Sequence, residues 1–577
     1  MNCPYWTDRI PQRNTVLTAG VADLVDARDL KSRGACPVRV RFPPPAPRGE
    51  LMRNLKNPFS CFFILFLISA GCESGNEDAD AGADAAGAAD AATGTDSDAD
   101  IDAGADAGDS GVHDFWGPAP DVETRLMIFD EMWKTLGRAY PCFVTNKVDW
   151  DEVNAVYRPM VEAARGYGEF YGILSSIFFM LKDGHTLIWS DRVCGESPGS
   201  FDPAFNLDLT QRPPVYVLED RISLIGACVT PTDDGELVVY RVDDDNPADL
   251  KPGDVITGYD GEDWMDLMIE VGEMNLPLCG RPASNDLSIE YKAMMSVMNN
   301  PHLFDELNFR RAGSDAIESV DTERLLDHAS TLACNDQLPV DGVDFPCDNW
   351  DACFDTGLFA SDDMTWGILK DTNIGYIYAY SWLVGMDQFF LDAVTALWDT
   401  DAIIIDQRFG VGGTVSWDQA TQWLFDEPVD YVMQCSPRSS WDDYEAINRD
   451  TGWVIGIKAD AGTYYDKPIA LLQGPKMGSA GDIFPYSMQY HPMVRRFGRV
   501  TDGRFGAMAY FWAPDPFIQD LHMAFTSCIF IDEHGDFLQN TKQKPEQEVW
   551  LNADDVARGV DTVVGEALDW IQGGSTK

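Results

Sequence analysis

The chain has 577 residues, of which 45% are hydrophobic, so its length and composition allow several domains with substantial cores. Its formal charge of 42 − 95 = −53 at pH 7 argues against nucleic-acid binding, which needs clustered Lys and Arg. The 7 histidines follow no zinc-binding spacing, and no phosphate-binding loop or dinucleotide fingerprint occurs. We therefore expect no metal, no cofactor and no nucleic-acid partner.

The N-terminal residues carry targeting information rather than a fold. Residues 1–51 have no hydrophobic period and resemble a translated transfer-RNA gene, so we expect synthesis to start at Met52. A basic segment then precedes an apolar stretch, 59–68, that is too short to span a bilayer. The sequence SAGC, ending at Cys72, resembles a bacterial lipobox. These features predict a lipoprotein signal peptide over 52–72, with an ordinary secretory signal as the alternative.

An acidic segment separates this signal from the folded part. Residues 73–112 consist almost wholly of Asp, Ala and Gly, a composition typical of a disordered, extended tether. A calcium-binding repeat is the alternative, but Gly and Glu are missing from the positions that it needs. We expect an exported cell-envelope protein, anchored to the outer membrane only through the lipid on Cys72.

Nine cysteines follow Cys72. In an exported protein this number favours disulfides and leaves at least one thiol over. The spacing does not determine which cysteines pair.

The folded part begins with a helical region, which we place at 113–198. Apolar residues recur at three- and four-residue steps in its first helix, and the segments 151–164 and 169–181 repeat the pattern. Gly184 is a helix-ending residue, and His185 is the first polar side chain after it. Without further information, a histidine there is typical of a surface or capping residue.

The middle of the chain changes to short β-rich runs over 199–269. The sequence LKPGDVI, followed by Asp-Gly, resembles the carboxylate-binding edge of a PDZ domain, which takes a peptide end as an added strand. Residues 270–362 contain a helix near 287–298 and a cluster of cysteines. We treat 270–362 as an insertion or linker without a mechanistic interpretation.

Strands and helices alternate from 363 to 577, which predicts an α/β layer with crossover connections. We expect buried strands at 374–380, 401–406 and 469–472, and a helix at 385–398. The whole chain is therefore predicted to be a multidomain α/β protein.

A serine lies at one strand-to-helix turn of this region, in the sequence GPKMGSAGD around Ser479. Its small neighbours would let a substrate backbone approach the hydroxyl, and the helix N-terminus would offer N–H groups to a developing negative charge. This arrangement is typical of an activated nucleophile. The alternative is that Ser479 only caps the helix.

Four segments in this order resemble the tail-specific, or C-terminal processing, serine protease family, on its tricorn-like and interphotoreceptor retinoid-binding protein-like branch. They are FDEMWKTLGRAYPCF with VDWDEVNAVYRPMV, LKDGHT, IIIDQRFGVGGT and MGSAGDIF. The resemblance covers about residues 120–570 and implies a ClpP/crotonase-like α/β catalytic domain over 363–577. It also implies an endopeptidase that cleaves peptides or unfolded protein segments with Ser479 as the nucleophile.

The resemblance also implies which residue is the base. The processing branch uses a lysine where this chain has Arg504, and arginine cannot act as a neutral base because its pKa lies above about 12. The tricorn-like branch takes a histidine from the helical region, and the match falls on His185, which can accept and return a proton near neutral pH. The implied oxyanion hole combines the Ala480 N–H with that of Gly412 or Gly413.

Two departures from the family concern the polar relay. The relay glutamate of the tricorn-like branch is Gln539 here, and the acid of the S-A-x-E turn is Asp482. Both are candidate relay residues, although an amide cannot stabilise an imidazolium by charge. The alternative function is therefore a surface lipoprotein of the same fold that has lost catalysis and binds peptides or small ligands. The sequence leaves the oligomeric state and the substrate open.

Overall fold

The computed structural model describes the greater part of the chain after the tether. The described residues are 115–195, 209–218, 223–328, 330, 332, 334, 343–344, 364–383, 385–413, 416–459, 464–512 and 520–574. The expected start at Met52, the signal peptide, the lipidated Cys72 and the tether lie outside them.

The N-terminal part is helical, as predicted. Its helices are α3 (Val122–Ala139), α4 (Phe143–Asn146), α5 (Trp150–Ala163), α6 (Tyr167–Met180) and α7 (Asp191–Cys194). The side chains of Asp121 and Asp149 accept hydrogen bonds from the first turns of α3 and α5. The apolar faces of the three long helices share one core, in which α6 is buried over most of its length.

The β-rich part contains a sheet with the order β3-β4-β5-β8-β9, in which β6 pairs with β5. Its strands are β3 (Ala227–Pro231), β4 (Leu237–Val242), β5 (Val255–Tyr259), β6 (Glu262–Asp263), β8 (Glu306–Arg310) and β9 (Ile317–Asp321). The helices α8 (Trp264–Glu273) and α9 (Asp286–Met298) pack on it through a shared apolar core. Because β8 and β9 belong to this sheet, it extends beyond residue 269.

Smaller elements surround this sheet. The strands β2 (Tyr216–Leu218) and β7 (Leu278–Gly280) form a parallel pair. Short helical segments are η3 (Leu209–Gln211), η4 (Pro301–Leu303) and α10 (Thr322–His328).

The C-terminal half contains a seven-stranded sheet with the order β10-β11-β12-β13-β16-β17-β20. Its strands are β10 (Val343–Asp344), β11 (Met364–Leu369), β12 (Ile374–Ala379), β13 (Ala402–Asp406), β16 (Ile469–Gln473), β17 (Val494–Gly498) and β20 (Gln547–Glu548). The pairs from β12 to β20 are parallel. The three strands predicted here are confirmed as β12, β13 and β16, so the α/β class is correct.

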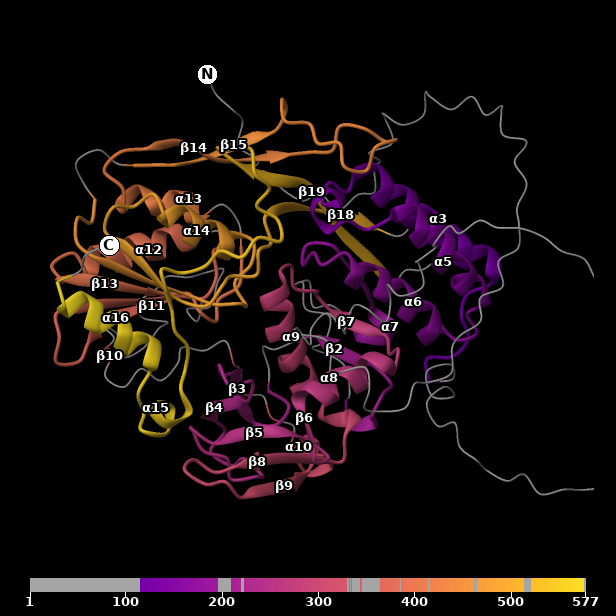
Figure 1. Cartoon of the computed structure of the whole chain (residues 1–577), viewed down its shortest axis with the longest axis horizontal. Coiled ribbons are helices and arrows are strands. Elements are labelled where there is room, and N and C mark those ends of the chain that lie inside the picture. The colour runs from indigo at the N-terminus through magenta and orange to yellow at the C-terminus, as the bar shows by residue number, and fades with distance from the viewer. Residues whose placement is uncertain are drawn as a thin grey trace, which may run out of the picture. The chain divides into compact units, whose positions relative to one another are not determined.

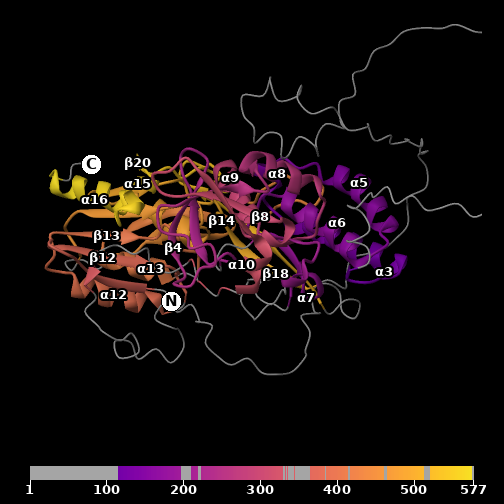
Figure 2. The same cartoon turned by 90° about the horizontal axis from the view of Figure 1, so that it is seen from below.

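Helices cover both faces of this sheet (Figure 2). One face packs against α12 (Met386–Ala396), α13 (Ser416–Ala420) and α14 (Ala480–Met488), and the other against α16 (Thr562–Gln572). Strand residues alternate between the two cores: Ile403 and Ile405 face one, and Ala402 and Ile404 face the other. The short segments η6 (Thr421–Trp423) and α15 (Ala553–Ala557) complete the half.

A second sheet joins the helical region to the C-terminal half (Figure 1). Its strands are β1 (Leu187–Ser190), β14 (Val429–Ser436), β15 (Trp453–Ile457), β18 (Gly506–Trp512) and β19 (Leu521–Asp532). β1 pairs antiparallel with β19, with Leu187 opposite Ala524. Because β1 starts two residues after His185, this pairing fixes the histidine segment against the C-terminal half.

Three disulfides are formed within the described residues: Cys194–Cys279, Cys228–Cys334 and Cys435–Cys528. Cys142 is buried and free. The first disulfide joins α7 to β7, and the third joins β14 to β19. Each crosslink restricts the unfolded chain and so stabilises the arrangement of elements that it joins.

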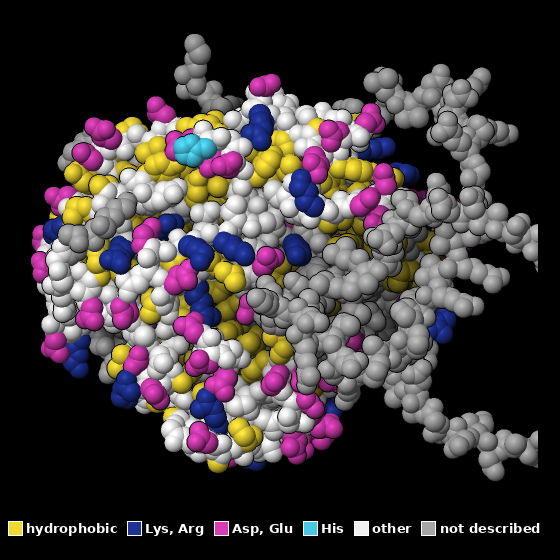
Figure 3. Space-filling view, in the orientation of Figure 1, with side chains coloured by type: hydrophobic (Ala, Val, Ile, Leu, Met, Phe, Trp, Pro, Cys, Tyr) yellow, Lys and Arg dark blue, Asp and Glu magenta, His cyan; other side chains and the backbone are white. Residues whose placement is uncertain are grey.

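The charge of the described surface is mixed. On the face drawn in Figure 3, Lys and Arg side chains gather along a band across the middle, among Asp and Glu that lie over the whole face. None of the helices in the described ranges is both long enough and apolar enough to cross a bilayer.

Candidate active site

Ser479 occupies a strained turn between β16 and α14. Its φ of 59° and ψ of −120° lie in a region that costs a non-glycine residue about 1–3 kcal/mol, and such strain concentrates at functional sites. The side chain makes no capping hydrogen bond to the helix, so capping does not explain the serine. The residue is partly exposed. The turn therefore holds a reachable hydroxyl at the N-terminus of α14.

The loop after β13 packs directly against this turn. A Cβ added at Gly412 would lie 2.5 Å from the Gly478 carbonyl oxygen and 2.8 Å from the Ser479 Cβ. The Gly412 carbonyl in turn accepts the Trp382 N–H at 3.1 Å, which fixes the loop. Gly413 lies farther along the loop, where it is exposed and bridges to Trp382.

Two backbone N–H groups at this contact have no acceptor among the described residues. Neither the Ala480 N–H nor the Gly412 N–H donates a hydrogen bond to any described residue. Ala480 is the first residue of α14, where helix N–H groups have no partner within the helix. Such a pair beside a hydroxyl can stabilise an oxyanion that forms on an attacked carbonyl.

Gly412→Ala should lower kcat for peptide cleavage by about 10²–10³, the effect of losing one oxyanion donor. The added methyl group would collide with Gly478 and Ser479 and displace the Gly412 N–H. Gly565→Ala is the matched control, since a Cβ there meets nothing within 4 Å. Equal kcat values for the two variants would exclude Gly412 from the site.

His185 follows α6 in a segment organised by the buried Asp183. One Asp183 carboxylate oxygen accepts the His185 N–H at 3.0 Å, and the other accepts the hydroxyls of Thr186 at 2.8 Å and Thr526 at 2.7 Å. Thr526 belongs to β19, and its own N–H donates to the Thr186 hydroxyl at 3.0 Å. Asp183 thus connects the histidine segment to the C-terminal half.

The surroundings of the His185 ring favour its neutral form. Only 5% of the residue is exposed, and its Nδ1 has no hydrogen-bond partner among the described residues. Burial, together with the charges of Arg504 and Arg281, lowers the pKa of His185 well below 6.5. A neutral imidazole is the form that can accept a proton from a hydroxyl.

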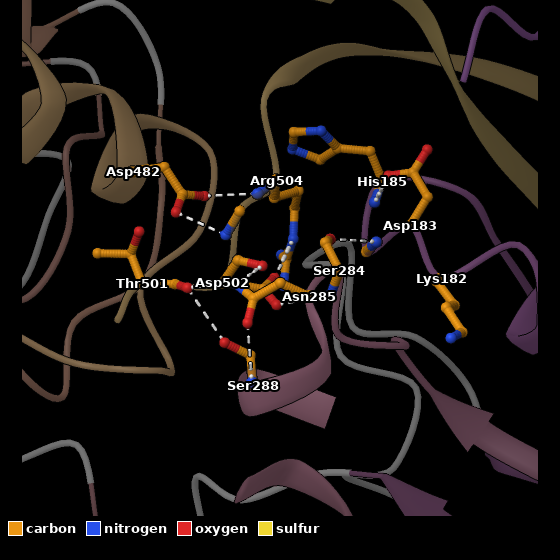
Figure 4. A network of polar contacts seen from close by, with 12 residues as sticks. Lys182, Asp183, His185, Ser284, Asn285, Ser288, Asp482, Thr501, Asp502 and Arg504 are labelled. Atoms are coloured by element: carbon orange, nitrogen blue, oxygen red, sulfur yellow. Dashed lines mark hydrogen bonds and ion pairs between the residues drawn. The ribbon is translucent and has the colours of Figure 1, made fainter. Parts of the chain in front are cut away.

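Arg504 lies between Asp482, Asp502 and His185 (Figure 4) and packs against both the serine and the histidine segments. A Cβ added at Gly184, beside His185, would lie 2.2 Å from the Arg504 Nε, and one added at Gly478, beside Ser479, would lie 2.9 Å from its Cζ. The guanidinium therefore packs against the residue that precedes each candidate. Although these candidates are 479 − 185 = 294 positions apart, the fold brings their segments to the same side chain.

The two candidate relay residues have different surroundings. The Asp482 carboxylate accepts the Gly503 and Arg504 backbone N–H groups, both at 2.8 Å, so it anchors the loop that carries Arg504. Burial, and the charge of Asp502 beside it, raise the pKa of Asp482 to about 7. Gln539 is 2% exposed, and both of its side-chain polar atoms lack partners within the described part of the chain.

A polar network that the sequence motifs did not indicate joins α9 to this site (Figure 4). The Ser284 N–H donates to the Asp502 carboxylate at 2.8 Å, and the Ser284 hydroxyl accepts the Gly184 N–H at 3.3 Å. Asn285, the N-cap of α9, donates to the carbonyls of Thr501 at 2.6 Å and Asp502 at 2.8 Å. No sequence signal relates these residues to His185, because their contacts depend on how the domains pack.

Carboxylates are frequent around this network, but they do not gather as metal ligands. Across the described ranges, no group of three or more His, Cys, Asp or Glu side chains is placed so that it could hold a metal ion.

Two family models match separate parts of the chain. Residues 373–549 match the model of peptidase family S41, and residues 121–179 match that of the tricorn protease C1 domain. No curated protein sequence matches significantly.

Among solved structures, mature CPAF is similar with a TM-score of 0.56 and 14% identity, over 79% of this chain and 99% of that one. Mature CPAF complexed with lactacystin gives a TM-score of 0.54 and 13% identity, over 78% of this chain and 98% of that one. At these identities the likeness shows a shared fold.

Proposed function

We propose that the protein is a serine endopeptidase with Ser479 as the nucleophile and His185 as the base, because residues 373–549 match the model of peptidase family S41. The substrate class is peptides or unfolded protein segments. The observation that carries the proposal is the strained conformation of Ser479, whose side chain makes no capping bond while two N–H groups beside it lack acceptors among the described residues.

The proposed reaction has two stages. The Ser479 oxygen attacks the carbonyl carbon of the scissile bond while His185 accepts the hydroxyl proton, and the N–H groups of Ala480 and Gly412 donate to the developing oxyanion. His185 then gives the proton to the departing amine, which leaves an acyl-enzyme. Water, deprotonated by the same histidine, releases the acid product and restores Ser479.

A fluorophosphonate probe tests this proposal, because it reacts covalently only with an activated serine. We expect the purified protein to be labelled, and mass spectrometry to place the label on the peptide that contains Ser479. Heat-denatured protein should not react. An unlabelled native protein that also cleaves no unfolded substrate would refute the peptidase proposal.

One observation favours a second candidate, a binding protein of the same fold. Both Gln539 polar atoms and His185 Nδ1 are buried without described partners, so no described carboxylate supports the imidazolium at Nδ1. A binding protein would take up peptides while Ser479 remained unreactive toward the probe.

Activity should persist at acidic pH, because the lowered pKa of His185 keeps its ring neutral below pH 6.5. Asp482, with its pKa of about 7, is instead the group that titrates near neutrality. We therefore expect the pH profile of kcat/KM to change near pH 7 in the native protein. The profile of Asp482→Asn should lack this change. A step at pH 6–7 that persisted in this variant would assign the titration to His185 and contradict the environment described for the ring.

The same shift predicts how the histidine affects stability. Below pH 6.5 the unfolded chain binds a proton at His185 that the folded protein does not bind. The folded state therefore loses stability from this group as the pH falls below 6.5.

We also propose that the protein is exported, with the PDZ-like part binding an extended stretch of substrate. Three disulfides support an oxidising compartment. The lipid anchor on Cys72 remains a proposal from the sequence alone.

A further inference from the structure

Two arginines of the C-terminal half, the buried Arg408 and the partly buried Arg504, differ in how fully they are paired. Arg408 uses its Nε and Nη2 for Asp406 and its Nη1 and Nη2 for Asp561, so both donor edges of the guanidinium hold a carboxylate. Arg504 donates from Nε and Nη2 to a single carboxylate, that of Asp502. No described residue accepts a hydrogen bond from Nη1 of Arg504.

The Nη1–Nη2 edge of Arg504 therefore lacks the carboxylate that the same edge of Arg408 holds. A guanidinium carries five N–H donors in a planar arrangement that suits two-point binding of carboxylates. The Arg504 side chain keeps 13% of its surface exposed, whereas that of Arg408 keeps none. Arg504 can thus accept a second anion that Arg408 has no room for.

The position of Arg504 indicates which part of a substrate would meet it. Its guanidinium packs against Gly184, the residue before His185, and against Gly478, the residue before Ser479. In the proposed reaction the histidine protonates the departing amine. The leaving group must therefore lie on the side of Ser479 that faces His185. A cation between the two segments lies beside the first residue after the scissile bond.

Two arginines lie near the histidine, and the carboxylates around them already have hydrogen-bond partners. Burial and the charges of Arg504 and Arg281 lower the pKa of His185, whereas the charges of Asp502, Asp482 and Asp183 outweigh burial and raise the pKa of Arg504. The nearby carboxylates already accept hydrogen bonds from the backbone. Asp183 accepts the His185 N–H, and Asp482 accepts the N–H groups of Gly503 and Arg504. Among the described carboxylates, only that of Asp502 is hydrogen-bonded to the Arg504 side chain, and it takes one edge.

We propose that Arg504 is a specificity-determining residue whose Nη1–Nη2 edge binds a carboxylate on the residue that follows the scissile bond. The inference rests on the proposed serine peptidase function. The carboxylate has two sources: the free C-terminus, if one residue is released, or an Asp or Glu side chain within a longer chain. Both present the same two oxygens to the guanidinium.

Matched peptides distinguish these sources. One pair ends one residue after the cleavage site, as a free acid or as an amide, and a second, longer pair has Asp or Asn at that residue. We expect the carboxylate member of at least one pair to have a kcat/KM higher by about 10- to 100-fold, the value of a hydrogen bond to a charged group. Equal rates within both pairs would overturn the proposal while leaving the peptidase function intact.

In the variant Arg504→Gln, the ratio of kcat/KM for the carboxylate peptide to kcat/KM for its neutral partner should fall close to one. This holds even if turnover of the neutral peptide also changes. Arg504→Lys keeps the charge but loses the two-point geometry, so an intermediate ratio is expected. Arg499→Gln is the control, because Arg499 lies in the same part of the chain but bonds to Asp233 and the Pro231 carbonyl. A ratio that stayed high in Arg504→Gln would exclude Arg504.

A binding experiment keeps the proposal testable if cleavage fails. Fluorescence anisotropy of the free-acid and amide peptides on Ser479→Ala, with and without Arg504→Gln, measures recognition without turnover. Tighter binding of the acid that depends on Arg504 would support carboxylate recognition even if no probe labels Ser479. Equal binding of acid and amide would overturn it, and circular dichroism would show that each variant is folded.

Discussion

Replacing Ser479 with alanine should abolish probe labelling and lower kcat for peptide cleavage by about 10⁴–10⁶, the range for loss of a serine nucleophile. The hydroxyl makes no capping bond, so its removal takes away the attacking atom without removing a contact of the fold. Thermal unfolding of the variant should match that of the native protein. The strained backbone of Ser479 remains in place, because the surrounding loops impose it.

Ser487→Ala is the matched control, since Ser487 lies in the same helix, is buried, and also has a hydroxyl without a partner in the described structure. It should keep both labelling and cleavage. Labelling that persisted in Ser479→Ala would mean that the reactive serine lies elsewhere, and the turn before α14 would lose its assigned role.

His185→Ala should cause a loss of similar size, because serine and histidine act as a unit and removing either one removes most of the acceleration. Binding of substrate should change much less, so the loss should fall on kcat rather than on KM. The measurement is steady-state cleavage of an unfolded substrate, together with the rate of probe labelling. His185→Gln, which keeps a polar side chain but no basic nitrogen, should behave like His185→Ala.

His534→Ala is the control, because that histidine has a side chain that is 74% exposed and lies 3.7 Å from the carboxylate of its neighbour Glu533. Cleavage that survived in His185→Ala would require another base. Arg504 cannot take that role, because a guanidinium stays protonated.

Much of the fold follows from local patterns in the sequence. The apolar periods before residue 182 predict α3, α5 and α6, and the short aliphatic runs predict β12, β13 and β16. These elements are recognisable because helix and strand periods leave a direct trace in the order of apolar residues. Ser479 is also recognisable from its local sequence, because small residues between a strand and a helix mark a sharp turn.

The surroundings of the candidate site are not predictable in this way. The role of Asp183 depends on Thr526, which lies 343 positions away in β19. Asp482 resembles a relay acid in the sequence, but its oxygens accept backbone N–H groups of the loop that carries Arg504. Arg504 itself packs against two glycines, Gly184 and Gly478, which lie on different parts of the chain. Such contacts are set by domain packing, which leaves no periodic signal.

The pairing of β1 with β19 also makes the position of the His185 segment depend on a strand that lies far along the chain. β1 emerges early and β19 late, because β19 ends at Asp532 in a chain of 577 residues. Until β19 is made, the His185 segment lacks the strand that holds it against the C-terminal half. In the proposed mechanism, a fragment that ends before β19 would therefore contain Ser479 without a base fixed beside it.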